Sequence, residues 1–522
     1  MHSRREGILD GTGADAAAVR ARTPDSSLPL GSALPSMGGT LRWLRHLVWP
    51  KGNSDGSQRQ LRSTAYLDGL RGFAAFLVYI HHHELWTHVA TNAAGTNDYK
   101  IFESGFGQDG IFRFATFPGI RNFFTGGHMA VAVFYVISGY VLSAKSLSLI
   151  HANEQLKLSE VLASSFFRRW FRLYLPLIVT TLVWVTSWHV FGVWVQNIHP
   201  KGTLGEELWN WYREFKSFSF LFRDGGDVWV SYNTHLWSIP LEMKGSIIIF
   251  AALASLSRAT TKARLLCEAF LVYYFMYIVD GYYLALFMSG MLQCDLDLLA
   301  RRSTADGGIT YFPRFLRRLE PFKTFIFYHL FVIGILLAGV PTHTDKVEDL
   351  REAPGWYYLS YLKPSAVYDS KWFYLSVAAN MIMACVPRIH WLRAFFESRF
   401  CQFLGRVSFA LYLVHGPILG SVGDRVYHAV GWVRALGDGS KELAPWINIL
   451  PLSRFGPMGL EIAFVIPQMI LLPLTLWVAD LTTRIVDEPS VRFASWLYKR
   501  TLGGAAPLEP KPEDSLPLMR LA

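Results

Sequence analysis

Two kinds of ionisable side chain interrupt an apolar, membrane-length run near the start of the chain. Residues 67–86 read LDGLRGFAAFLVYIHHHELW, with Arg71 near the beginning and His81, His82 and His83 towards the end. Ionisable groups are costly inside a bilayer and usually have a function there. Imidazole exchanges protons near neutral pH, and guanidinium binds phosphate in a bidentate manner. The run therefore predicts a chemical site within the membrane.

The spacing of these residues predicts how they share a helix. Arg71 and His82 are 11 residues apart, about three helical turns, so they lie on one face and differ in depth by roughly 16 Å. We expect Arg71 at the cytosolic headgroup level and His82 near the middle of the bilayer. His81 and His83 are each turned about 100° from that face. An alternative interpretation is that Arg71 reaches the headgroups and the histidines only make polar contacts between helices.

A carboxylate lies in a second apolar stretch. Residues 234–250 read THLWSIPLEMKGSIIIF and contain Glu242 and Lys244, with Pro240 expected to weaken the helix and to free a backbone carbonyl. Glu242 could orient a histidine, bind a substrate hydroxyl or pair with Lys244. A further histidine, His415, follows in RVSFALYLVHGPIL.

Three arginines cluster in the stretch FFRRWFRLYLP, at positions 168, 169 and 172. Arg168, Arg169 and Arg172 can be interpreted as ordinary cytosolic anchors of a membrane helix. They can also form a clamp for a phosphorylated ligand that arrives from the cytosol.

Composition indicates which elements must carry these residues. Of the 522 residues, 51% are hydrophobic, 15% are aromatic and only 17% are charged, against about a quarter charged in soluble domains. The fold class predicted is an all-α, polytopic integral membrane protein with about ten transmembrane helices. The expected apolar spans are residues 67–86, 128–144, 173–195, 236–256, 265–279, 281–296, 324–340, 372–386, 407–422 and 457–480.

Charge placement predicts the orientation of these spans. With a cytosolic N-terminus, the four predicted cytosolic loops hold 18 Lys and Arg in 83 residues, and the opposite loops hold 15 in 145. This asymmetry follows the positive-inside rule and places both termini in the cytosol. It also accounts for the net charge of +10 without nucleic acid as a partner. The four cysteines have no metal-site or disulfide spacing, so no metal site is predicted from them.

The chain is expected to have three parts. Residues 1–63 are predicted to be a disordered to basic, amphipathic cytosolic segment, residues 64–493 the membrane domain, and residues 494–522 a Pro-rich C-terminal tail. An N-terminus without a secretory signal peptide suggests a eukaryotic endomembrane such as the endoplasmic reticulum.

Several motifs, in order along residues 64–493, resemble the acyltransferase-3 family of polytopic membrane O-acyltransferases. LDGLRG followed by His82 is similar to the family's Arg-x10-His signature, and RRWFRLYLP to its RRxxR motif. HLWSIPLE is similar to the WSLxxE motif, of which Glu242 is the last residue. VFYVISGY, FMSGM, LGRVSFALYLVHGP and the DEP at 487–489 are similar to other family segments.

The resemblance implies a membrane O-acyltransferase with an acyl-CoA, in first place acetyl-CoA, as co-substrate and no bound cofactor. The bilayer and a hydroxylated glycan or small-molecule acceptor would be its other partners. His82 would act as general base or carry the acyl group, and Glu242 would orient the acceptor or the imidazole. The CoA phosphates would bind Arg71 and the arginine cluster at 168–172. The cavity lining would include Trp237, Ser238, Tyr412 and His415.

Two other classes of function remain open from the sequence. A proton-coupled transporter could use an intramembrane His and Glu, but the internal repeat with paired broken helices that is typical of such proteins is not visible. A catalytically silent relative could bind acyl-CoA or lipid as a sensor. The arginine cluster on the cytosolic side of a membrane histidine favours the acyltransferase, because a proton relay does not require it.

Overall fold

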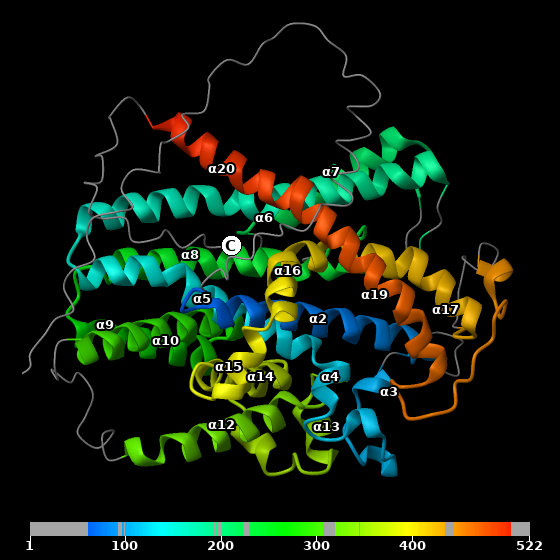
Figure 1. Ribbon diagram of the computed structural model, residues 1–522, viewed down its shortest axis with the longest axis horizontal. Helices are drawn as coiled ribbons and strands as arrows, with labels where there is room; N and C mark the ends of the chain where they lie inside the picture. Colours follow the sequence, from blue (N-terminus) through cyan, green and yellow to red (C-terminus); the bar gives the residue numbers. More distant parts are fainter. Residues whose placement is uncertain are drawn as a thin grey trace, which may run out of the picture. The chain divides into compact units, whose positions relative to one another are not determined.

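A computed structural model describes residues 61–502 except for 92–96, 99, 193–194, 196–199, 223–228, 306–318, 344 and 434–442. The described residues are almost entirely helical (Figure 1). The first half contains α2 (Ala65–Thr87), α3 (Lys100–Glu103), α4 (Arg121–Thr125), α5 (Gly127–His151), α6 (Gln155–Phe191), α7 (Leu204–Ser219), α8 (Ser238–Ser255) and α9 (Thr261–Tyr273). The second half contains α10 (Tyr282–Ala305), α12 (Lys323–Ala338), α13 (Val347–Glu352), α14 (Ser370–Cys385), α15 (His390–Phe396), α16 (Arg399–Ile418), α17 (Asp424–Val430), α19 (Ile462–Thr482) and α20 (Glu488–Thr501). The strands β1 (Ala90–Thr91) and β2 (Asn97–Asp98) form one short antiparallel pair.

The all-α fold class predicted from the sequence is confirmed. Each of the ten apolar runs overlaps a helix within the described residues. Within the described residues, seven helices are long and apolar enough to cross a membrane, or eight if α14 and α15, bent by 97°, form one span. Helices α2 and α9 are not among them, and in α2 the reason is its content of charged and histidine side chains. Ten crossings therefore stay a prediction.

The chain termini lie largely outside the described residues. Positions 1–60 and 503–522, which include most of the predicted N-terminal segment and C-terminal tail, are not described. Helix α20 continues to Thr501, eight residues beyond the predicted end of the membrane domain. The parts proposed for 1–63 and 494–522 stay predictions.

Helix α2 is packed between α5 and α16 near the centre of the described structure (Figure 1). Glycines let its backbone approach α16 closely: a Cβ on Gly72 would lie 2.1 Å from the backbone nitrogen of Gly405. A Cβ on Gly405 would lie 2.4 Å from the carbonyl oxygen of Asp68. Small residues at helix crossings are the usual means by which membrane helices pack tightly. The glycines of the LDGLRG and LGR motifs thus set the distance between α2 and α16.

A buried ion-pair cluster fixes the other end of α2. His88, directly after the helix, contacts Glu461 before α19 through Nε2, at 3.0 Å from Oε2, and Glu84 through Nδ1, at 3.1 Å from Oε2. Burial lowers the pKa of His88, but hydrogen bonds and charge interactions with Glu461 and Glu84 outweigh it and raise the pKa to about 9. The imidazolium therefore joins α2 to the segment that leads into α19.

We expect Gly72→Ala to lower the melting temperature of the purified protein in detergent, because the added Cβ must push α2 away from α16. Overpacking of this kind costs about 1–3 kcal/mol. Gly205→Ala in α7 is the matched control, since the nearest atom to its new Cβ would lie 4.0 Å away. Equal melting temperatures for the two variants would contradict the close contact.

The His88 cluster predicts a pH dependence of stability. Because the pKa of His88 is raised from 6.5 to about 9 on folding, its contribution is fully present below pH 6.5 and is lost as pH rises through 9. The melting temperature in detergent should fall between pH 7 and pH 9.5 in the wild type. His88→Gln should melt lower at pH 7 and lose part of this fall. A fall of the same size in both proteins would exclude His88 as its cause.

Candidate functional site

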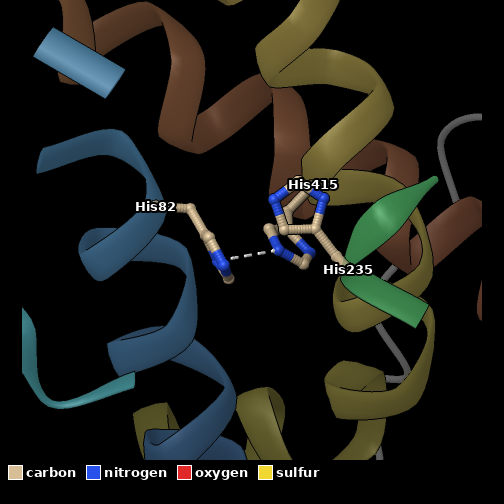
Figure 2. A group of neighbouring side chains, drawn as sticks. All are labelled: His82, His235 and His415. Atoms are coloured by element: carbon tan, nitrogen blue, oxygen red, sulfur yellow. Dashed lines mark hydrogen bonds between the residues drawn. The ribbon is translucent and has the colours of Figure 1, made fainter. Parts of the chain in front are cut away.

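Three histidines from different parts of the sequence meet in the interior. Figure 2 shows His82 on α2 facing His415 on α16 and His235, which lies on a 3₁₀ turn (Thr234–Trp237) before α8. The His82 ring centroid lies 4.2 Å from that of His235 and 5.1 Å from that of His415. The rings of His235 and His415 are 4.8 Å apart. We call these three residues the histidine trio.

The hydrogen bonds of the trio define which ring nitrogens carry protons. Nδ1 of His415 lies 3.1 Å from the Leu411 carbonyl oxygen, which can only accept, so this nitrogen is protonated and Nε2 carries a lone pair. That Nε2 lies 3.2 Å from Nδ1 of His82, which is also 2.9 Å from the Val78 carbonyl oxygen. Nδ1 of His82 is therefore the donor to both acceptors. The remaining nitrogen of His82, Nε2, has its lone pair available for chemistry.

His235 is held by a different set of contacts. Its Nδ1 lies 3.2 Å from Oδ1 of Asn233, and Nδ2 of Asn233 donates to the Leu413 carbonyl at 3.0 Å. A Cβ on Gly416 would lie 2.3 Å from Nδ1 of His235, so only glycine leaves room for the ring. The HGP sequence thus supplies both His415 and the space for His235.

Glu242 pairs with an arginine of the cluster. Its Oε1 forms a short ion pair with Arg169 and accepts a hydrogen bond of 2.5 Å from Ser138. Nε of Arg169 donates to Ser246 Oγ at 2.8 Å. Neither Lys244 nor an imidazole is among the described hydrogen-bond partners of Glu242. Helix α8 begins at Ser238, so Pro240 lies in its first turn, where proline is tolerated, and not at a break within the helix.

The other predicted arginines lie on α2 and α6 and interact with α16 and with Asp487. Arg71 donates from Nε to Ser408 Oγ at 3.2 Å, and from one terminal nitrogen to the Gly405 carbonyl and to Asp68, each at 3.1 Å. Arg172 and Arg71 both interact electrostatically with Asp487 of the DEP motif.

Arg168 lies one residue before Arg169 on α6, and its Nε donates to the Ser164 carbonyl at 3.1 Å. Arg169 and Arg172 also interact with each other electrostatically. The four predicted arginines therefore gather in one region of the protein, but Arg71 and Arg169 already have hydrogen-bond partners within it.

The remaining predicted lining residues lie beside the trio. The Tyr412 hydroxyl is 2.8 Å from Ser238 Oγ and forms a short hydrogen bond to the carbonyl of His235. Trp237 contacts Trp372 of α14, with ring centroids 6.1 Å apart. Tyr412 and Ser238 thus connect α16 to the turn that carries His235.

Sequence reasoning missed His235, Asn233 and Asp487 as members of this region. His235 stands at the start of the HLWSIPLE segment, two residues before Trp237, so its position in that motif was the available signal. The pairing of Glu242 with Arg169 joins the HLWSIPLE motif to the RRWFRLYLP motif, and the spacing within either motif gives no signal for it.

Comparison with known proteins shows the family. The profile of the acyltransferase-3 family, described as an acyltransferase domain, matches residues 64–484, and the chain belongs to this family. It is 29% identical to the O-acetyltransferase PaAT-1 of Phomopsis amygdali, over 85% of this chain and 86% of that protein. It is 22% identical to the acyltransferase clz18 of Cochliobolus lunatus, over 84% of this chain and 96% of that one. No solved structure matches it. Family and apolar helices together identify a membrane acyltransferase.

The Glu242–Arg169 pair predicts non-additive effects on stability. Removing one partner of a buried pair leaves an uncompensated charge and costs about 3–5 kcal/mol, whereas replacing both by apolar residues can be neutral. We expect Arg169→Met and Glu242→Leu each to lower the melting temperature in detergent, and the double variant to melt above both single variants. A double variant that melts below both would show that the two side chains stabilise the fold independently.

Proposed function

We propose that the protein transfers an acyl group, in first place acetyl from acetyl-CoA, to a hydroxyl of a carbohydrate or a small secondary metabolite. The observation that carries the proposal is the arrangement of His82. Its Nδ1 is held by the Val78 carbonyl and by His415, which leaves Nε2 as a fixed base or nucleophile. A relative named an O-acetyltransferase supports the choice of acetyl and of a hydroxyl acceptor.

The chemistry has two routes that start from the same nitrogen. In the first, Nε2 of His82 takes the proton of the acceptor hydroxyl while its oxygen attacks the thioester carbonyl carbon. The carbon–sulfur bond breaks, and the imidazolium returns the proton to the departing CoA thiolate. In the second, Nε2 attacks the thioester carbonyl carbon, the carbon–sulfur bond breaks and CoA leaves as the thiolate. The acceptor oxygen then attacks the acyl carbon on Nε2, the carbon–nitrogen bond breaks, and the hydroxyl proton goes to the thiolate. In both routes His415 positions His82, because it accepts the Nδ1 hydrogen.

The arginines would hold the phosphates of the acyl-CoA on the cytosolic side. Arg71, Arg168, Arg169 and Arg172 are gathered at one end of α2, and Arg71 precedes His82 by roughly 16 Å along the helix. The pantetheine arm is long enough to extend from phosphates at that level to a thioester beside the trio. Since Glu242 already pairs with Arg169, we expect its main effect to be the orientation of Arg169 and Ser138 at the border of the site.

The proposed setting is an endomembrane such as the endoplasmic reticulum, with about ten crossings and both termini in the cytosol. The density of Lys and Arg in alternate loops supports this orientation. Acyl-CoA would then enter from the side on which the arginines lie.

The experiment compares the metabolites and released glycans of four strains by untargeted mass spectrometry. The strains are the parent, the deletion, His82→Ala and His329→Ala. His329 is an exposed histidine on α12 whose ring contacts the Phe325 carbonyl of the same helix, so it serves as the control. We expect the deletion and His82→Ala to lose the same acylated species and to accumulate its free hydroxyl form. Loss of a general base or acyl carrier reduces the rate by about 100-fold or more.

His329→Ala should retain the acylated species. If His82→Ala also retains all acylation at matched protein levels, His82 is not the reacting residue. If the deletion only redistributes a metabolite between compartments, the protein acts as a transporter and the proposal fails.

A further inference from the structure

A second group of potential ligands lies beside the histidine trio and uses none of its residues. His81 on α2 and His128 on α5 both face Glu103, the last residue of α3. Nε2 of His81 lies 4.0 Å from Oε1 of Glu103, and Nδ1 of His128 lies 3.8 Å from the same oxygen. One donor atom from each of the three residues lies within 4.8 Å of the other two.

These separations are too long for hydrogen bonds. The His151–Asp295 pair of the same protein, by contrast, has a nitrogen–oxygen distance of 2.6 Å. Nδ1 of His128 is buried and has no hydrogen-bond partner, although it points towards the carboxylate. A histidine–carboxylate pair that served only to stabilise the fold would be expected to close to about 3 Å. The gap between the three donors is therefore a feature that packing alone does not explain.

We propose that His81, His128 and Glu103 bind a divalent transition-metal ion of the zinc type. Two imidazoles and one carboxylate are a common set of three protein ligands for zinc and leave a fourth position open. With bonds of about 2.0–2.1 Å, tetrahedral ligands are roughly 3.4 Å apart. The two histidine–carboxylate distances of 4.0 and 3.8 Å would therefore have to close by roughly half an ångström, and no pair of donors by more than about 1.4 Å. This proposal does not depend on the proposed function.

The surroundings of the three residues suit such a site. Thr342 donates to Oε1 of Glu103 at 2.9 Å and so orients the carboxylate from outside, as partners of metal ligands usually do. Gly127 leaves space for the His81 ring, since a Cβ there would lie 2.7 Å from the ring carbons Cγ and Cδ2. His81 itself is 3% exposed, so a bound ion would be shielded from water on its side.

Two cationic side chains near Glu103 would repel a bound metal ion and lower its affinity. Lys371 and Arg121 both interact electrostatically with Glu103. Lys371 is paired with Asp369, whereas Arg121 donates to the backbone carbonyls of Glu103 and Ser104 at 3.0 and 3.1 Å. Among the described residues, the hydrogen bonds of Arg121 go to backbone carbonyls, and its charge acts on the Glu103 carboxylate that would bind the ion. We therefore expect Arg121→Gln to bind the metal more tightly.

The histidine trio is the obvious competitor for a metal and is less suited to one. Its donors also lie within 4.8 Å of one another, but it has no carboxylate to offset the charge of the ion. Nδ1 of His82 and Nε2 of His415 are already used in the hydrogen bond between them. Variants of the two groups distinguish the alternatives directly.

The test measures zinc in the full-length protein, purified in detergent, stripped with a chelator and reloaded with zinc before gel filtration. We expect about one zinc per chain in the wild type and in His235→Gln, and a loss of most of it in His128→Gln and Glu103→Gln. Added zinc should also raise the melting temperature of the wild type and of His235→Gln but not of the two ligand variants.

Two ligand variants, His128→Gln and Glu103→Gln, are used so that the test still holds if one of them fails to fold. Arg121→Gln, by removing the opposing charge, should hold zinc at a higher chelator concentration than the wild type. The proposal is overturned if reloaded wild type contains no more zinc than a protein with both ligand substitutions. It is also overturned if His235→Gln, and not His128→Gln, loses the metal.

Discussion

The close contact between α2 and α16 is the constraint on which the site depends. The backbones meet at Gly72 and Gly405, and the two helices contact each other again where His82 meets His415. The two helices are parallel here, because each runs from the glycine contact to the histidine contact in the direction of increasing residue number. Two points of contact fix the sliding and the rotation of α2 against α16. A shift of either helix would separate Arg71 from Ser408 and His82 from His415 together.

Polar side chains in this apolar interior are held by partners from distant segments. Glu242 is held by Arg169 and Ser138, and Asn233, which contacts His235, donates to the Leu413 carbonyl of α16. Each buried polar group that lacks a partner would cost several kcal/mol, so such contacts also select which helices can be neighbours. The network that orients the site therefore also contributes to the specificity of the fold.

Helix positions could be predicted because the apolar runs are long and contain few charges. Residues 324–340 and 457–480 are examples, and α12 and α19 lie there. The face shared by Arg71 and His82 could also be predicted, since it follows from helical geometry alone. The partners of His82 could not, because His415 is 333 residues away and spacing within one helix gives no information about its neighbours. Pairings such as Glu242 with Arg169 depend on packing, and Lys244 was the nearer but incorrect partner in sequence.

The histidine triplet shows how one turn of helix can serve three different neighbours. Successive residues on α2 point about 100° apart, so the three rings face different elements. His82 faces the trio, His81 faces Glu103 and α5, and Nδ1 of His83 lies 2.6 Å from the Tyr427 hydroxyl of α17. Only the middle ring has its Nδ1 held by both a backbone carbonyl and a second imidazole. His82 therefore has a fixed tautomer and an available Nε2. Its hydrogen-bond partners, and not its residue type, distinguish it from His81 and His83.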